Sequence, residues 1–236
     1  MTRKPMTLDY FLWEQEGSIA TLTFNRPEKR NGLDLHVMLE FETLIQRARD
    51  TPEIKILIAT GTGSAFCAGA DLTLARDAKS AEERAELTAQ MGQVPRIIGR
   101  VFDTMTHMDV ISIAAVNGYA VGGGWSIALG FDHVVAVQEA MFWLPEVEIG
   151  QPFRGLANVG LTQRLGPGLA KEAMILGRRF SANELRDLRV INQVCESAEL
   201  MNQSRRVADA YLAAPWRAAI ATRREINATV YGPQHY

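Results

Sequence analysis

NGYAVGGGWS, residues 117–126, is the segment from which the organisation of this chain is inferred. It follows VISIAAV, residues 110–116, which is apolar enough to form a strand buried on both faces. Residues 127–130 continue it as a short buried helix. Three adjacent glycines at such a junction cost backbone entropy. In return they leave a row of peptide N–H groups open at a helix N-terminus, which is the geometry of an anion or oxyanion site.

The glycine row has a second interpretation, because glycines also allow a helix to pack tightly against a strand. A second junction of the same kind favours the anion site. FCAGADL, residues 66–72, follows an apolar run at residues 54–59 and a turn-rich segment at residues 60–64. Two such junctions in one sheet can each aim one N–H at the same point. Enzymes hold the developing negative charge on an acyl oxygen in this way.

Strand and helix patterns alternate along the rest of the chain. The segment QEGS at residues 15–18 predicts a hairpin between the strands on either side of it. Asp34 is expected to cap a helix that runs to about residue 50. Ser80 and Glu83 form a capping box that opens a helical region to about residue 108, interrupted by Pro95. The expected strands are residues 10–14, 19–24, 54–60, 110–116, 133–137 and 141–143, and the expected C-terminal helices are residues 167–176, 181–188, 198–214 and 215–229. This alternation predicts a parallel-rich α/β core with right-handed crossovers.

Composition narrows the class of protein. A chain of 236 residues that is 47% apolar can form one large domain, or one domain with an appended helical piece. The formal net charge of −2 gives no electrostatic footprint for nucleic acid or for an anionic membrane. The first ten residues lack the apolar core of a signal peptide, and no apolar run is long enough to span a bilayer. A soluble, cytoplasmic protein is therefore expected.

The cysteines and histidines form no metal or disulfide pattern. Cys67 and Cys195 are too few for a disulfide framework, and the four histidines show no ligand spacing, so no metal is expected. Cys67 lies beside the candidate anion site, which makes a nucleophilic thiol conceivable. No histidine is near it in sequence, so a small packing residue is the favoured interpretation.

Four motifs taken together resemble the crotonase (enoyl-CoA hydratase/isomerase) superfamily. They occur in the family's order and at about its spacing, and TQRLG at residues 162–166 fits the next landmark. The motifs are NRPEKRN at residues 25–31, FCAGADL at 66–72, AAVNGYAVGGG at 114–124 and LPEVEIG at 144–150. The resemblance covers essentially the whole chain. It implies a spiral of ββα units over residues 1–190, followed by a C-terminal helical region, residues 191–236, that carries trimer contacts and is shorter than in the family.

The resemblance also implies an active site. The backbone N–H groups of Ala70 and Gly123 would polarise the thioester carbonyl of an acyl-coenzyme A, and removal of one such donor costs about 3 kcal/mol of transition-state stabilisation. Coenzyme A enters as part of the substrate, so no separate cofactor is expected, and a homotrimer or a dimer of trimers is implied. The residues placed near coenzyme A are Arg26, Lys29, Arg30, Ala68, Asp71, Leu72, Tyr119, Gly122 and Pro145. The alternative interpretation of Arg26, Lys29 and Arg30 is a solvated basic loop that does not contact coenzyme A.

The acid and base residues depart from the hydratase pattern of the family, which has one glutamate after the glycines and another in the Pro-Glu motif. Glu146 keeps the second position, whereas Ser126 occupies the first. A serine hydroxyl orients a water but does not act as a carboxylate base near neutral pH. Apolar neighbours at residues 142–144 are expected to raise the pKa of Glu146. Glu148 is a candidate second carboxylate, and Arg154 is a candidate partner of Glu146 or of the acyl group. For both residues the alternative is a solvent-exposed charge with no role in the reaction.

A single base beside an oxyanion hole favours a Δ3-Δ2 enoyl-CoA isomerase, in which Glu146 takes a proton from C2 and returns it at C4. An enoyl-CoA hydratase or a hydroxycinnamoyl-CoA hydratase-lyase is the first alternative, with Ser126 and Glu146 holding the water. Some such lyases also use a C-terminal tyrosine, which is not matched in this chain. The second alternative is a catalytically weak protein that binds coenzyme A thioesters. Binding to nucleic acid or to membranes is not expected.

Overall fold

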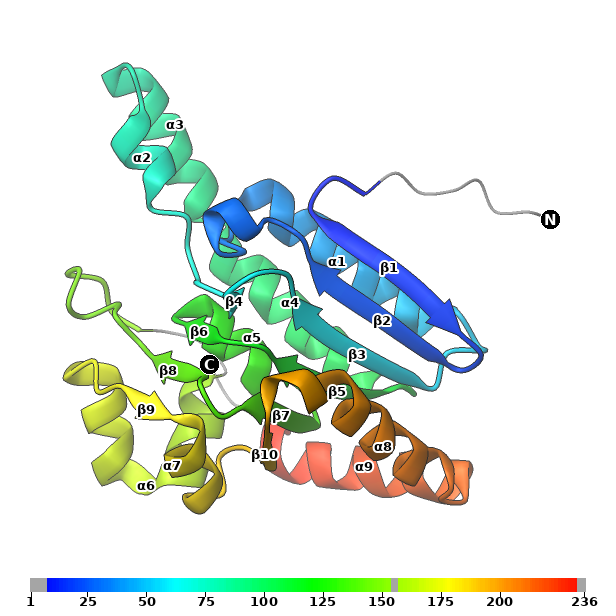
Figure 1. The fold of residues 1–236 in the computed structure, drawn as a ribbon. Coiled ribbons are helices and arrows are strands. Elements are labelled where there is room, and N and C mark those ends of the chain that lie inside the picture. The colour runs from blue at the N-terminus through cyan, green and yellow to red at the C-terminus, as the bar shows by residue number, and fades with distance from the viewer. Residues whose placement is uncertain (1–7, 154–156, 233–236) are drawn as a thin grey trace.

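A six-stranded sheet forms the centre of the fold in the computed structural model, which describes residues 8–153 and 157–232 (Figure 1). Neighbouring strands are parallel, apart from the β1–β2 hairpin. In spatial order the strands are β1 (Phe11–Glu16), β2 (Ile19–Phe24), β3 (Ile56–Gly61), β5 (Ile111–Val116), β7 (His133–Val137) and β10 (Gln193–Cys195). The hairpin and the parallel core predicted from the sequence are thereby confirmed.

A second sheet is built from very short strands. Its order is β4 (Ala65–Cys67), β6 (Tyr119–Val121), β8 (Met141–Trp143) and β9 (Phe180–Ser181). The first three of these strands each follow a strand of the large sheet and precede a helix, so the chain repeats a unit of strand, strand and helix. This repeat confirms the predicted ββα spiral. The sequence patterns indicated β8 but not β4, β6 or β9, which have only two or three residues each.

Helices surround the two sheets. Two of them, α2 and α3, extend away from the sheets, whereas α8 packs on β5 and β7 (Figure 1). The helices are α1 (Leu35–Asp50), α2 (Thr73–Asp77), α3 (Ala81–Met91), α4 (Val94–His107), α5 (Gly123–Leu129), α6 (Ala157–Ile175), α7 (Ala182–Asp187), α8 (Leu200–Leu212) and α9 (Trp216–Tyr231). No helix within the described ranges is long and apolar enough to cross a membrane.

The predicted helix starts follow local capping chemistry. The Asp34 carboxylate accepts a hydrogen bond from the Val37 amide, as expected for the cap of α1. Ser80 accepts one from the Glu83 amide, but the Glu83 carboxylate accepts from the Lys79 amide instead of completing a capping box with Ser80. Pro95 lies in the first turn of α4, where proline is tolerated, so the long helical region divides into α3 and α4.

The structure differs from the sequence prediction at two places in the C-terminal part. Helix α6 begins ten residues before the expected start at residue 167, and a kink at Gly166, whose φ is +72°, separates its two halves. Strand β10 lies within the region expected to be helical and pairs with β7. The large sheet therefore takes its last strand from beyond residue 190.

A buried charge network attaches α9 to the body of the protein. The Arg223 guanidinium donates to Asp132 Oδ1 at 2.8 Å and to the carbonyl oxygens of Met105 and Met108. Asp132 Oδ2 accepts from both the amide and the hydroxyl of Ser112, in β5. Each group in this network is thereby paired, as burial of charge requires.

We expect Arg223→Met to lower the free energy of unfolding by about 3 kcal/mol, because Asp132 loses its ion partner and the carbonyls of Met105 and Met108 lose a donor in a largely buried network. Urea unfolding followed by circular dichroism measures this change. The exposed ion pair of Arg224 and Asp109 supplies the control, since Arg224→Met should change the free energy by less than about 1 kcal/mol. An equal effect of the two substitutions would contradict this account.

Candidate active site

Two backbone segments come into direct contact where β4 and β6 end. A Cβ atom on Gly69 would lie 2.6 Å from the carbonyl oxygen of Val121 and 3.3 Å from the amide nitrogen of Gly123. Gly69 also has a φ of +77°, which disfavours any other residue. The two strand-to-helix junctions singled out in the sequence therefore meet at one place.

Leu33 determines which way the Ala70 amide points. The Leu33 amide donates to the Gly69 carbonyl at 2.7 Å, and the Leu33 carbonyl accepts from the Asp71 amide at 2.8 Å, which makes a parallel bridge between Leu33 and Ala70. In such a bridge the residue opposite points its own N–H to the other side of its strand. Ala70 is exposed, and its N–H has no acceptor among the described residues.

Each glycine of the triple has its own structural reason. Gly122 has a φ of +52°, and a Cβ atom there would lie 2.6 Å from Glu146 Oε1. Gly123 is the first residue of α5, so its N–H precedes the first helical hydrogen bond and has no acceptor in the part of the chain that the structure describes. A Cβ atom on Gly124 would overlap the carbonyl oxygen of Cys67. The row thus serves tight packing at Gly124 and leaves an open donor at Gly123.

Glu146 lies beside the glycine row, in the turn that follows β8. Its Oε1 atom faces Gly122, and its buried Oε2 atom has no hydrogen-bond partner within the described residues. Burial raises the pKa of the Glu146 carboxyl above the ordinary glutamate value. The shift expected from its apolar sequence neighbours is therefore confirmed.

Ser126 is buried on the first turn of α5. Its hydroxyl donates to the Gly122 carbonyl at 3.1 Å, one helical turn back. The proton of this hydroxyl is engaged, so the oxygen has only its acceptor capacity left for a ligand.

Cys67 has no feature of a nucleophile. It is fully buried, and burial raises the pKa of its thiol to about 12, so the thiolate is absent at neutral pH. Its sulfur accepts a hydrogen bond from the Gly69 amide at 3.4 Å. These contacts fit the small packing residue favoured by the sequence. Nor do the described residues include a group of three or more His, Cys, Asp or Glu side chains that could hold a metal ion.

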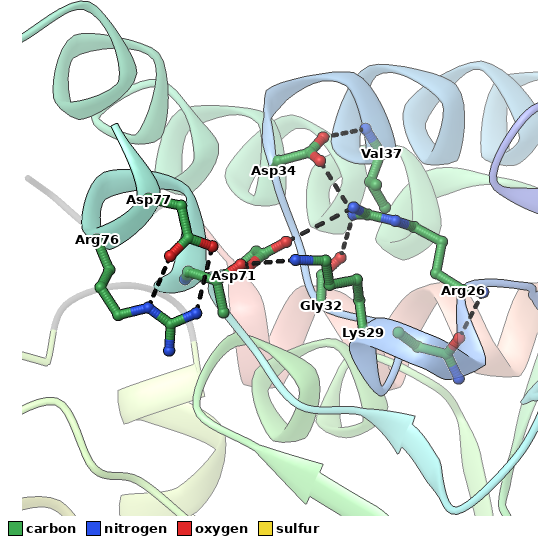
Figure 2. A network of polar contacts seen from close by, with 10 residues as sticks. Arg26, Lys29, Gly32, Asp34, Val37, Asp71, Arg76 and Asp77 are labelled. Atoms are coloured by element: carbon green, nitrogen blue, oxygen red, sulfur yellow. Dashed lines mark hydrogen bonds and ion pairs between the residues drawn. The ribbon is translucent and has the colours of Figure 1, made fainter. Parts of the chain in front are cut away.

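The three cations predicted near the phosphates of coenzyme A have different surroundings. Figure 2 shows Arg26 pointing toward Asp34 and Asp71, to which it is joined at 2.9 and 3.5 Å. Lys29 is exposed and donates to the Thr73 hydroxyl at 2.8 Å. Arg30 is exposed at a φ of +49°. The structure thus leaves Lys29 and Arg30 at the surface, whereas the charge of Arg26 is directed inward.

The remaining predicted residues lie around the junctions. Leu72 is 58% exposed beside Ala70, and Tyr119 is exposed with its ring edge against Trp143. The Glu148 carboxylate lies against Gly177 and not beside Glu146. This position fits the interpretation of Glu148 as a surface charge. Of the other residues predicted near coenzyme A, Ala68 and Pro145 are half-buried and Asp71 is buried. Arg154 lies outside the described residues.

Sequence reasoning missed three side chains at this site. Leu33 and Ile98 approach the position that a Cβ atom of Gly123 would occupy, at 3.1 and 3.8 Å, so apolar groups flank that donor. Asn31 is buried at a φ of +56°, accepts from the Arg26 amide and donates to the carbonyls of Thr62 and Ala65. An asparagine in a Pro- and Gly-containing loop was the available signal, because asparagine tolerates this conformation.

Comparison with known proteins shows which proteins this chain resembles. The family model described as enoyl-CoA hydratase/isomerase matches residues 14–235. A short-chain-enoyl-CoA hydratase of Clostridium acetobutylicum is 33% identical over 210 residues, which cover 86% of this chain and 76% of that protein. A carnitinyl-CoA dehydratase of Escherichia coli is 35% identical over 217 residues, which cover 91% and 78%. The crystal structure of an enoyl-CoA hydratase from a Polaromonas species superposes with a TM-score of 0.81 at 29% identity, covering 93% of this chain and 83% of that one.

The raised pKa of Glu146 predicts how Glu146→Gln changes stability. Between the ordinary glutamate pKa and the raised one, the folded state holds a proton that the unfolded state has lost, so rising pH destabilises the wild type. Glutamine does not titrate. Glu146→Gln should therefore melt above the wild type at pH 8, and this difference should shrink as the pH falls toward 4.5.

Thermal unfolding of both proteins between pH 4.5 and 8 measures the difference. Glu148→Gln, at an exposed glutamate two residues away, is the matched control for removal of a carboxylate from this turn. A constant offset between wild type and Glu146→Gln at all pH values would refute the coupling.

Proposed function

The chain belongs to the enoyl-CoA hydratase/isomerase family, and from this premise we propose that it converts acyl-coenzyme A thioesters through an enolate, with Glu146 as the base. The observation that carries the proposal is the position of Glu146. Its carboxylate lies against Gly122, next to the open N–H of Gly123, and one of its oxygens is buried without a partner. Coenzyme A enters as part of the substrate.

In the proposed reaction, the thioester oxygen accepts hydrogen bonds from the N–H groups of Ala70 and Gly123. Glu146 removes a proton from C2, and the electron pair of that bond moves into the carbonyl to form the enolate. The negative charge develops on the oxygen that the two donors hold, and donors that are already in position stabilise this charge without reorganisation. A carboxylate with a raised pKa is the stronger base and retains the proton until it is returned.

Return of this proton at C4 completes a Δ3-Δ2 enoyl-CoA isomerisation. The double bond moves from C3–C4 to C2–C3, and the enzyme ends in the state in which it began. One carboxylate is sufficient for this shuttle. The hydroxyl proton of Ser126 is engaged by the Gly122 carbonyl, and Glu148 lies against Gly177, so neither supplies a second base.

Addition or removal of water is the second candidate, and the relatives favour it. The similar proteins include a short-chain-enoyl-CoA hydratase and a carnitinyl-CoA dehydratase. In this chain, the oxygen of Ser126 would accept a hydrogen bond from the water while Glu146 activates it. A protein that binds coenzyme A thioesters with little turnover is the outcome that would contradict both candidates.

Separate incubation with 3-trans-hexenoyl-CoA and 2-trans-hexenoyl-CoA tests the two reactions. We expect isomerisation of the first compound and little hydration of the second, with isomerisation falling at least about 100-fold in Glu146→Gln because the base is lost. Products are identified by chromatography and mass spectrometry. Glu148→Gln is the control that should keep activity. Binding of both thioesters without any turnover would refute the enzymatic proposal.

Ser126→Ala separates the two candidates further. If water is held by the serine, hydration of 2-trans-hexenoyl-CoA should fall about tenfold or more in this variant, whereas proton transfer between C2 and C4 does not need the hydroxyl. The ratio of the two activities in wild type and Ser126→Ala is the measurement. An equal loss of isomerisation and hydration in Ser126→Ala would contradict the view that the hydroxyl serves the isomerase only through its hydrogen bond to the Gly122 carbonyl.

A further inference from the structure

Arg26 is directed inward, although the family resemblance implies a place for it beside the phosphates of coenzyme A. Its side chain is only 14% exposed, and Nη1 donates both to Asp34 Oδ2 and to the Gly32 carbonyl at 2.9 Å (Figure 2). Nη2 lies 3.5 Å from Asp71 Oδ2, and the guanidinium lies over the ring of Tyr10. One positive charge thus faces two carboxylates, which leaves no excess positive charge to attract a phosphate.

These contacts surround the bridge that orients Ala70. Gly32 and Asp34 flank Leu33, which forms one side of the bridge, and Asp71 directly follows Ala70 on the other side. A single guanidinium therefore connects the two segments whose pairing at Leu33 and Ala70 sets the direction of the Ala70 N–H.

Asp71 depends on Arg26 for one of its oxygens. Oδ1 accepts from the amide and the hydroxyl of Thr73, at the start of α2. Oδ2 is buried, has no hydrogen bond within the described residues, and has the Arg26 guanidinium as its ion partner. Loss of that partner leaves a buried carboxylate oxygen uncompensated, and the segment must move to solvate it.

We propose that Arg26 is a positioning residue, which holds the Ala70 N–H in place through Asp71 and the Leu33 bridge and does not bind the substrate. This inference rests on the proposed function, since it assigns Arg26 to the oxyanion donor of that reaction. Displacement of a catalytic donor by about 1 Å lowers rates by about 100-fold without removing any contact to the substrate's remote parts. A positioning role and a phosphate-binding role therefore differ in whether kcat or substrate affinity changes.

The test uses Asp71→Asn and Arg26→Lys. Asp71→Asn keeps the positive charge of Arg26, and Arg26→Lys keeps a positive charge but loses the planar fork. The readout is exchange of the C2 protons of butyryl-CoA in D2O, followed by NMR, because it reports enolate formation whichever product the enzyme makes. We expect kcat for exchange to fall about 10- to 100-fold in both variants. KM for butyryl-CoA, and Kd for free coenzyme A by calorimetry, should stay within about twofold.

Arg223→Lys is the matched control. It alters another guanidinium that joins separate segments through a carboxylate and backbone carbonyls. Arg223→Lys should lower stability without changing kcat for exchange. That result would exclude general destabilisation as the cause of a lower kcat in Asp71→Asn and Arg26→Lys. Circular dichroism spectra and melting curves establish that each variant is folded at the assay temperature.

The possible outcomes separate the two proposals. A wild-type protein that catalyses neither exchange nor any thioester conversion would overturn the proposed function. An active wild type with unchanged kcat in Asp71→Asn would overturn the positioning role alone. A rise of KM and of Kd for coenzyme A in Arg26→Lys, with kcat unchanged, would assign the guanidinium to phosphate binding.

Discussion

The close approach of two peptide backbones at Gly69 and Gly123 is the constraint on which the site depends. The absence of a side chain at Gly69 lets the segment after β4 reach the carbonyl of Val121, and the absence of one at Gly124 lets α5 reach the carbonyl of Cys67. Neither contact leaves room for a methyl group. Because the chain is held this closely, the N–H groups of Ala70 and Gly123 belong to neighbouring segments although they are far apart in sequence. The rest of the fold supplies the rigid sheets that bring these segments together.

The features that could be predicted from sequence are those with a local physical cause. The hairpin of β1 and β2, the Asp34 cap and the buried strand before the glycine row each follow from adjacent residues. The strands of the small sheet could not be found in this way, because three residues are too few to show a period. The family resemblance provided the pairing of Ala70 with Gly123, which no local pattern contains.

The partners of charged side chains were the least predictable part of the site. Arg26 lies in a basic loop, and its sequence neighbours suggest an exposed cation. Its partner Asp71 belongs to a segment that reaches it only through the pairing of Leu33 with Ala70. Glu146 is the opposite case, because its apolar neighbours adjoin it in sequence and its raised pKa could be expected. The burial that raises this pKa makes the ionised form of Glu146 unfavourable, so above that pKa the carboxylate costs the folded state stability.

The attachment of α9 to Asp132 has a consequence for biosynthesis. A chain leaves the ribosome with its N-terminus first, so the strands that carry the site emerge long before Arg223 does. Until then, Asp132 and the carbonyls of Met105 and Met108 lack the donor that pairs them in the finished protein. The nascent chain can form its sheets early, yet Asp132, which directly precedes β7, has no ion partner until α9 has left the exit tunnel. Docking of α9 on Asp132 therefore follows the synthesis of every strand of the large sheet.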